Sequence, residues 1–474
     1  MHSPLVVLGG GPGGYAAAFL AADEGLEVTL VEAEPRLGGT CLLRGCIPSK
    51  ALLHVARVIS EVEELSHDWG VSFGQPQIAL EQLRARKEKV ISTLSGGLKQ
   101  LAKRRKVTVI HARGIFENST TLRLDGDHDS IPDDHQLTFD YLILATGSTP
   151  AMPPSLSSDS PRVMDSTGAL ELPEIPQSLL VVGGGYIGLE LGTVYARLGT
   201  RVSIVELTDG LLPGADRDLV KPLSKKIHEL VEDRVYLDTK VGSLGDHGNS
   251  IEVAFEGPNK YGVEYFDRVL VSVGRRPTSG GLGLENTSVE IVERGFVGCD
   301  TQQRTRDPHI FAIGDVAGEP MLAHKASHEA RVAVEVILGK NVVFEPAAIP
   351  AVVFTDPEVA WAGLTEGDAK RENVPHQVAL YPWGASGRAQ ALGRIEGVTK
   401  WLVDPESERV LGCGICGPGA GELIAEAALA IEMGCEMRDV TNTIHAHPTL
   451  SETLMNAGEV FYGTATEIYK PKRR

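Results

Sequence analysis

An internal repeat, separated by 174 positions, constrains the fold of this chain more than any other feature. Residues 6–32 and 180–206 align without a gap. Each copy reads as an apolar run, a glycine-rich turn, a helix-forming stretch closed by a glycine, and a second apolar run that ends in glutamate. This order is the outline of a strand, a helix and a parallel strand. The sequence therefore predicts two similar α/β units.

The glycines of both copies follow the spacing Gly-x-Gly-x-x-Gly. They are Gly9, Gly11 and Gly14 in the first copy and Gly183, Gly185 and Gly188 in the second. Because glycine lacks a Cβ, this spacing permits a tight turn, lets the backbone approach a pyrophosphate and allows close packing of the helix. The helix N-terminus also offers free N–H groups and a positive dipole to phosphates. The two turns therefore predict two bound dinucleotides.

A glutamate ends the second apolar run of each copy, at Glu32 and Glu206. A carboxylate in this position accepts hydrogen bonds from ribose hydroxyls. At the second site Glu206 would repel the 2′-phosphate of NADP. The sequence therefore predicts NAD rather than NADP at that site.

Two cysteines, Cys41 and Cys46, lie close together after the first repeat. An ideal helix would rise about 7.5 Å between them, which places their α-carbons beyond the reach of a disulfide. A regular helix therefore cannot join them as a bridge, but Gly45 permits a local distortion and Pro48 fits a helix that becomes regular just afterwards. A helix N-terminus and Lys50 would favour thiolate over thiol. Two readings remain open here, a short reducible bridge and two unpaired core cysteines.

Composition limits the remaining possibilities. At about 150 residues per domain, 474 residues suggest about three units. No run of about 18 apolar residues occurs, so we expect no membrane span. The net charge of −18 disfavours attraction to nucleic acid or to anionic lipid. Six cysteines are too few for a secreted disulfide scaffold, and strand-like sequence begins by Leu5, so we expect a cytoplasmic protein.

The segment at residues 38–50 (GGTCLLRGCIPSK) resembles the active-site signature of the pyridine nucleotide-disulfide oxidoreductases. The resemblance continues through both glycine turns, residues 145–147, residues 311–315 and residues 445–452, and it spans nearly the whole chain in the family's order. Within the family the chain is most similar to members that oxidise dihydrolipoyl groups. The resemblance implies an α/β fold with two Rossmann-like dinucleotide-binding domains and an α+β C-terminal dimerisation domain.

The same resemblance implies four consecutive segments. An FAD-binding domain would span residues 1–149 and an NAD-binding domain residues 150–276. A central segment at residues 277–345 would complete the FAD site, and an interface domain would occupy residues 346–474. Within the first segment residues 51–106 read as helical, and the basic cluster at residues 84–87 reads as a solvated helix face.

Cofactor contacts carried over from the family fall into two groups. FAD would be bound by the first glycine turn together with Glu32, Lys50, Gly114, Thr146, Gly147, Asp315 and Ala323. NAD would be bound by the second glycine turn together with Glu206, Val241 and Gly274. Glu190 would pair with Lys50 beside the flavin. We expect no metal site, because the pair Cys413 and Cys416 lacks a second pair and resembles an interface strand.

The catalytic residues implied by the resemblance are Cys41, Cys46, His447 and Glu452. Cys41 would meet the substrate and Cys46 would face the flavin. His447 would be the base, since an imidazole accepts and returns a proton near neutrality, and Glu452 would orient it. His445 reads as a structural histidine. The family places the His447 segment against the cysteines of a second subunit, which implies a homodimer.

The implied activity is the oxidation of protein-bound dihydrolipoamide to lipoamide with reduction of NAD⁺. The expected partner is the lipoyl domain of an E2 acyltransferase or of an H-protein. One alternative is another disulfide reductase of the family, similar to glutathione or mercuric reductase. Glu206 disfavours an NADPH-specific reductase, and the chain lacks the terminal cysteine pair that resembles mercuric reductases. A second alternative is a flavoprotein redox sensor without turnover.

Overall fold

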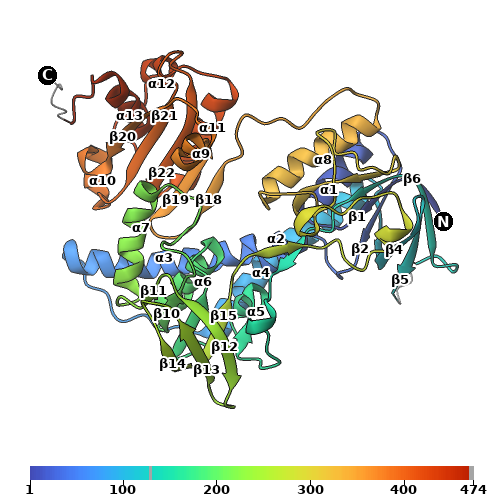
Figure 1. Ribbon diagram of the computed structural model, residues 1–474, viewed down its shortest axis with the longest axis horizontal. Helices are drawn as coiled ribbons and strands as arrows, with labels where there is room; N and C mark the ends of the chain where they lie inside the picture. Colours follow the sequence, from blue (N-terminus) through green and yellow to red (C-terminus); the bar gives the residue numbers. More distant parts are fainter. Residues whose placement is uncertain (127–130, 469–474) are drawn as a thin grey trace.

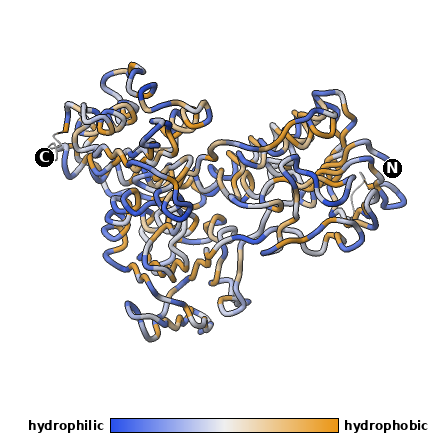
Figure 2. The backbone as a smooth tube through the Cα atoms, turned by 45° about the horizontal axis from the view of Figure 1, so that its top comes forward, coloured by the Kyte–Doolittle hydropathy of each residue, from blue (hydrophilic) through white to orange (hydrophobic). Residues whose placement is uncertain are grey.

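The computed structural model describes residues 1–126 and 131–468. Figure 1 shows a first α/β unit at the right, a second α/β unit below, and a C-terminal unit at the upper left. Hydrophobic residues gather along the inner strands near the N-terminus, as Figure 2 shows. Along the described ranges, no helix is both long enough and apolar enough to cross a membrane.

The first unit is built on a seven-stranded sheet in the order β3-β2-β1-β6-β5-β4, with β17 added beside β6. Its strands are β1 (His2–Leu8), β2 (Val28–Glu32), β3 (Thr108–His111), β4 (Arg113–Asn118), β5 (Thr121–Asp125), β6 (Gln136–Leu144) and β17 (Ile310–Ala312). The strands β1, β2, β3, β6 and β17 pair in parallel, whereas β4 and β5 pair antiparallel. The central segment of the chain therefore completes the first sheet through β17.

The helices that accompany this sheet are α1 (Pro12–Asp23), α2 (Gly39–Arg44), α3 (Cys46–Asp68), α4 (Leu80–Arg104) and α8 (Ala323–Ile337). Of these, α1, α4 and α8 pack in its core, whereas α3 packs against the second unit, and α2 and α3 carry the cysteines. The predicted helical region is thus two helices, α3 and α4, with residues 69–79 outside them. The prediction of a fully solvated basic face was wrong for Lys87, which is buried and donates to the carbonyl of Leu170 at 2.5 Å. That carbonyl lies near the C-terminus of a helix in the second unit, where a cation is favoured.

The second unit repeats the strand–helix–strand arrangement. Its five-stranded sheet, in the order β11-β10-β9-β15-β8, contains β8 (Val163–Met164), β9 (Ser178–Val182), β10 (Arg201–Val205), β11 (Val235–Tyr236) and β15 (Arg268–Val271). A three-stranded sheet contains β12 (Lys240–Asp246), β13 (Ile251–Glu256) and β14 (Gly262–Phe266). The helices are α5 (Ser166–Glu171), α6 (Tyr186–Arg197) and α7 (Arg217–Leu230).

Two short strands, β7 (Ser148–Pro150) and β16 (Arg275–Pro277), link the first two units. They pair antiparallel where the chain passes into the second unit and where it leaves it. The amide of Ala151 also donates to the carbonyl of Gly274 at 2.9 Å. The passage between the units is therefore a hydrogen-bonded crossing rather than a loose linker.

The C-terminal unit is an antiparallel sheet in the order β18-β19-β22-β21-β20. Its strands are β18 (Ala351–Val353), β19 (Glu358–Gly363), β20 (Gln377–Pro382), β21 (Val398–Val403) and β22 (Val410–Gly417). Its helices are α9 (Glu366–Glu372), α10 (Gly387–Leu392), α11 (Ala420–Glu432), α12 (Met437–Asn442) and α13 (Glu452–Tyr462). Short 3₁₀ turns along the chain are η1 (Pro154–Leu156), η2 (Leu284–Asn286), η3 (Glu293–Gly295), η4 (Gly314–Val316) and η5 (Trp383–Ala385).

A buried lysine joins the C-terminal unit to the second unit. Lys400 of β21 is fully buried, and its Nζ lies 2.7 Å from Asp216, 2.7 Å from Asp218 and 2.9 Å from Glu366. Burial would lower the pKa of Lys400, but hydrogen bonds to the three carboxylates raise it. The lysine therefore remains charged and acts as the counter-ion of this acidic cluster.

Cys413 and Cys416 lie on β22, three residues apart, and both are buried. Cys413 packs in the core beneath α11 and α13, whereas Cys416 packs in the core shared with the second unit. Burial raises the pKa of both thiols. The two cysteines therefore pack on opposite faces of one sheet, as expected for buried residues of a strand.

Candidate active site

Each glycine turn has a backbone that only glycine accommodates. Gly9 has φ +111°, and a Cβ there would lie 2.3 Å from the carbonyl oxygen of Ala145. Gly183 has φ +106°, and a Cβ there would lie 2.6 Å from the carbonyl oxygen of Ser272. The first glycine of each motif thus lets the strand turn tightly beneath a neighbouring strand.

The last glycine of each motif is closely packed, whereas the middle glycine faces open space. A Cβ on Gly14 would lie 1.7 Å from the carbonyl oxygen of the first glycine of its turn, and one on Gly188 would lie 2.2 Å from the equivalent oxygen. At Gly11 the nearest atom would be 3.8 Å away, and at Gly185 no atom lies within 4 Å. The middle glycines therefore expose backbone to open space, as a bound pyrophosphate requires.

The two repeated glutamates make the same hydrogen bonds. Glu32 accepts from the amide of Gly10 at 2.6 Å, and Glu206 accepts from the amide of Gly184 at 2.7 Å. Each also accepts from the amide two residues further on, at 2.8 Å. Burial raises the pKa of Glu32, and these amides oppose the rise. The duplication seen in the sequence is therefore preserved in the hydrogen bonding.

One large cavity, of about 1010 Å³, opens between the first glycine turn and the helices that carry the cysteines. The predicted residues that line it are Gly9, Gly11, Glu32, Cys41, Cys46, Lys50, Gly114, Thr146, Gly147, Glu190, Asp315 and Ala323. Its size and its glycine cradle fit a dinucleotide such as FAD. Gly14 and the predicted NAD contacts are not in its wall. The cavity is therefore lined by the residues predicted to bind FAD, with the exception of Gly14.

The predicted second site lies apart from this cavity. Gly274 has φ +124° with open space beside it, and Glu206 lies directly after β10. Val241 is buried and packs in the core with Val182 and Val205, at the ends of β9 and β10. The predicted NAD contacts thus lie near the carboxyl edge of the second sheet.

The cysteines lie on either side of a break between two helices. Cys41 belongs to α2 and Cys46 is the first residue of α3. Gly45 between them approaches the preceding turn so closely that a Cβ would lie 2.8 Å from the carbonyl oxygen of Thr40. The predicted distortion at Gly45 is thus confirmed, and it brings the two sulfurs together.

The two sulfurs are free thiols, and each influences the ionisation of the other. Donation from the Cys41 thiol lowers the pKa of Cys46 to about 7, and the ammonium of Lys50 adds to this effect against burial. The same hydrogen bond, together with burial, raises the pKa of Cys41. Cys46 is therefore the better thiolate of the pair.

Lys50 lies one turn along α3 from Cys46, because it follows four residues later. Its Nζ lies 2.8 Å from Oε2 of Glu190, which is buried on α6. The amide of Phe354 donates to the other carboxylate oxygen at 3.0 Å, and the phenyl ring lies 4.5 Å from the ammonium. The ion pair predicted for Lys50 and Glu190 is present. The part played by Phe354 was missed, because no motif marks it.

Asp315 faces the same cavity from η4. Its Oδ2 accepts a hydrogen bond from the hydroxyl of Ser148 at 2.5 Å. That hydroxyl in turn accepts from Nε of Arg275 at 2.7 Å. Sequence reasoning missed Ser148 and Arg275 as site residues. The only available signal was that Ser148 directly follows the matched triplet ending at Gly147.

His447 and Glu452 form the predicted pair on the C-terminal unit. Nδ1 of His447 lies 2.9 Å from Oε1 of Glu452, and the amide of Thr449 donates to Oε2 at 2.8 Å. Partial burial would raise the pKa of Glu452, but these two hydrogen bonds lower it. The imidazole is 79% exposed. His445, by contrast, is buried and bonded to Glu426 at 2.6 Å.

The structure does not bring His447 to the cysteines within one chain. Of the described residues, none beyond Ala326 lines the large cavity. Figure 1 places α12 and α13 at the far upper left, well away from α2. One chain therefore carries the two halves of the predicted catalytic constellation in separate places.

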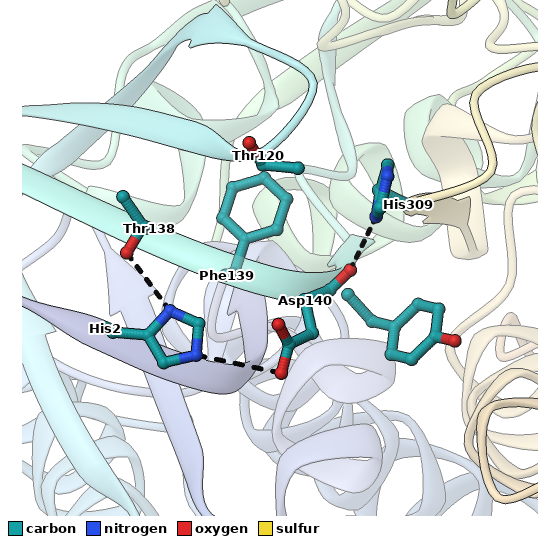
Figure 3. A pocket seen from close by; sticks show the side chains of 7 residues that line it. His2, Thr120, Thr138, Phe139, Asp140 and His309 are labelled. Carbon is teal, nitrogen blue, oxygen red and sulfur yellow. Dashed lines mark hydrogen bonds and ion pairs between the residues drawn. The ribbon is translucent and has the colours of Figure 1, made fainter.

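A second, shallower cavity lies on the outer surface of the first unit (Figure 3). His2 bonds Thr138 at 3.1 Å and lies 3.7 Å from the carboxylate of Asp140, and His309 bonds the carbonyl of Asp140 at 2.9 Å. These polar groups satisfy one another. None of the predicted site residues lines this cavity.

The chain matches two family models. Residues 3–330 match "Pyridine nucleotide-disulphide oxidoreductase", and residues 349–457 match the dimerisation domain of the same family. The chain therefore belongs to the pyridine nucleotide-disulphide oxidoreductase family, and it is an oxidoreductase. This confirms the predicted family, fold class and enzyme class.

Relatives with high sequence identity are dihydrolipoyl dehydrogenases. The dihydrolipoyl dehydrogenase of Vibrio parahaemolyticus is 48% identical and that of Haemophilus influenzae is 47% identical, each over 100% of this chain and 98% of the relative. Among solved structures, LpdA of Mycobacterium tuberculosis superposes with a TM-score of 0.87 at 26% identity, covering 97% of this chain and 99% of that one. The family uses FAD and NAD(H), which confirms the two predicted cofactors.

Proposed function

We propose that this chain oxidises protein-bound dihydrolipoamide to lipoamide and reduces NAD⁺, the activity named in its curated relatives. The observation that carries the proposal is the presence of the free thiols of Cys41 and Cys46 together in the wall of the dinucleotide cavity. A thiol pair in this position can exchange with a dithiol substrate on one side and face FAD on the other.

The exchange begins at a substrate thiol. In the oxidised enzyme Cys41 and Cys46 form a disulfide. His447, presented by the second copy of a homodimer, accepts the thiol proton at Nε2, because its Nδ1 is bonded to Glu452. The substrate thiolate attacks Sγ of Cys41 and Cys46 leaves as thiolate. The second substrate thiol then attacks the mixed disulfide, releasing Cys41 with the proton and forming lipoamide.

The low pKa of Cys46 suits it to leave, since a sulfur of low pKa leaves faster. When bound in the cavity lined by Cys46 and Lys50, FAD would supply the capacity to accept the electron pair of the dithiol and to reduce NAD⁺ by hydride transfer. Lys50 contributes a positive charge beside Cys46, and Glu190 fixes the position of that charge. Lys50 therefore favours the thiolate of Cys46, whereas the negative charge of Glu190 opposes it.

We assign the cofactor contacts as the family resemblance implies them. The first glycine turn, Glu32, Gly114, Thr146, Gly147, Asp315 and Ala323 bind FAD, and the second glycine turn with Glu206, Val241 and Gly274 binds NAD. Glu206 accepts from a ribose hydroxyl and disfavours a 2′-phosphate. Its buried carboxylate, held by two backbone amides, supports this role.

The family dimerisation domain over residues 349–457 supports a homodimer. The dimer completes each site, because it can place the exposed His447 of one copy beside the cysteines of the other. The protein partner is the lipoyl domain of an E2 acyltransferase or of an H-protein, and the complex works in the cytoplasm.

The decisive experiment is a steady-state assay of the holoenzyme with two substrate pairs. Dihydrolipoamide with NAD⁺ is the expected pair, and glutathione disulfide with NADPH tests the alternative reductase. Turnover with the second pair alone would overturn the proposal. Absence of turnover with either pair, in a protein that retains FAD, would favour a redox sensor.

The role of His447 has a matched control on the same loop. His447→Gln should lower lipoamide turnover by about 10²–10⁴-fold, the usual contribution of a general base, and should leave FAD bound. His445→Gln removes the other histidine, which is bonded to Glu426, and should retain turnover. Unimpaired turnover in His447→Gln would contradict the assigned role.

A further inference from the structure

The crossing between the two nucleotide-binding units ends directly on the flavin cavity. Pro277 of β16 pairs with Ser148 of β7, and the carbonyl of Gly147 accepts from the amide of Thr278 at 2.9 Å. Ser148 and Arg275 both line the cavity. The backbone that carries the second unit is therefore joined to the wall of the first site.

Three side chains form a directed chain of hydrogen bonds at this crossing. Arg275 donates from Nε to the hydroxyl of Ser148 at 2.7 Å and from Nη2 to the carbonyl of Ser148 at 2.7 Å. A guanidinium has only donors and a hydroxyl has one proton. The proton of Ser148 must therefore point to Oδ2 of Asp315, at 2.5 Å.

The residue before Asp315 is held by a buried carboxylate. The amide of Gly314 donates to the buried carboxylate of Glu329 at 2.6 Å, and Glu329 is paired with Lys325 at 2.7 Å. Oδ1 of Asp315 has no hydrogen-bond partner among the described residues, and the residue lines the cavity. Ser148 thus fixes one carboxylate oxygen and leaves the other for a ligand hydroxyl.

We propose that Ser148 and Arg275 are positioning residues that hold the Asp315 carboxylate in place for FAD and so couple retention of FAD to the crossing of the two units. This rests on the proposed function, which places FAD in the cavity. Ser148 is 4% exposed, so water cannot readily replace its hydroxyl as the donor. Arg275 reaches Asp315 only through Ser148.

The neighbouring arginine provides a matched control. Arg276 lies on the same strand but is exposed, and its Nε lies 3.4 Å from the hydroxyl of Thr149. Arg276 also lines the cavity, so it has the same charge on the same strand and in the same wall, without a place in the chain of hydrogen bonds.

The test follows FAD release from the diluted holoenzyme by flavin fluorescence. Ser148→Ala and Arg275→Met should each release FAD about tenfold faster or more, as expected for the loss of a hydrogen bond to a charged group. Arg276→Met should stay within about twofold of the parent, since an exposed weak contact contributes little. Should Ser148→Ala fail to fold, the comparison of Arg275→Met with Arg276→Met decides alone.

A double-mutant cycle separates positioning from packing. If Ser148 acts through the carboxylate, Ser148→Ala should change release by less than about twofold in an Asp315→Ala background, which has no acceptor for the hydroxyl. Full additivity, or release at the parent rate in both single variants, would overturn the proposal. Release of FAD is measured without turnover. A parent enzyme that fails to oxidise dihydrolipoamide would therefore refute the proposed function, while the FAD release rates of the variants would still test the role of Ser148 and Arg275.

Discussion

The ionisation of Cys46 can be tested through the hydrogen bond that governs it. Donation from the Cys41 thiol is the largest influence that lowers the pKa of Cys46 from 9.0 to about 7. At pH 7 a pKa of about 7 leaves about half of the sulfur as thiolate, whereas a pKa of 9 leaves about 1%. The change to make is therefore the removal of the donor.

Two substitutions at one position isolate the donor. Cys41→Ala removes the hydrogen bond, and Cys41→Ser replaces the thiol donor with a hydroxyl. Neither variant can form the disulfide. Cys46 should titrate near 7 in Cys41→Ser and at a higher pH in Cys41→Ala, because desolvation and the charge of Glu190 are then opposed only by Lys50 and a backbone hydrogen bond.

The assay is the thiolate-to-flavin charge-transfer absorbance of each holoenzyme as a function of pH. Because the pKa is lowered, the thiolate is present above it, so the band should be lost as the pH falls through about 7 in Cys41→Ser. In Cys41→Ala the loss should begin at higher pH. Coincident titrations of the two variants would refute the reasoning.

Three further predictions use other contacts. Gly14→Ala should abolish FAD retention, since its Cβ would lie 1.7 Å from a backbone oxygen. The control is Gly96→Ala, which places a Cβ in open space on α4. This variant should retain FAD, and its free energy of unfolding in urea should rise by about 0.5–1 kcal/mol. Lys400→Met should cost about 1.5–3 kcal/mol in the same measurement, because it removes the hydrogen bonds of a fully buried cation to three partly exposed carboxylates; an unchanged unfolding midpoint would contradict this. Glu206→Ala should lower kcat/KM for NAD⁺ about tenfold or more and reduce the preference over NADP⁺, and an unchanged ratio of kcat/KM values would contradict the role of Glu206.

Sequence reasoning succeeded where backbone geometry dictates residue type. The repeat predicted the turns at Gly9 and Gly183 and the glutamates beside them, because a strand that turns beneath its neighbour leaves no room for a Cβ. The break at Gly45 followed from helix geometry alone. The resemblance to the family then supplied roles that no spacing contains, such as those of Asp315 and Glu190. The segment boundaries remain predictions.

The contacts that sequence reasoning missed are made across large sequence separations. Ser148 and Arg275 meet only because two short strands pair at the crossing. Phe354 reaches Glu190 from another unit by a backbone amide, which carries no residue-specific signal. Lys87 reads as a surface residue because its partner is a carbonyl contributed by a different helix. Such partners can be identified only from the three-dimensional structure, in which the units are in contact.

The placement of the thiols and of the exposed His447 on different lobes has a genetic consequence. Consider a mixed dimer of one chain that lacks Cys41 and one chain that lacks His447. One of its two active sites would then carry both substitutions, and the other would carry neither. Two alleles that are each inactive alone would then complement one another. Under the proposed sharing of His447 across the dimer, the unit on which selection acts is the pair of polypeptides.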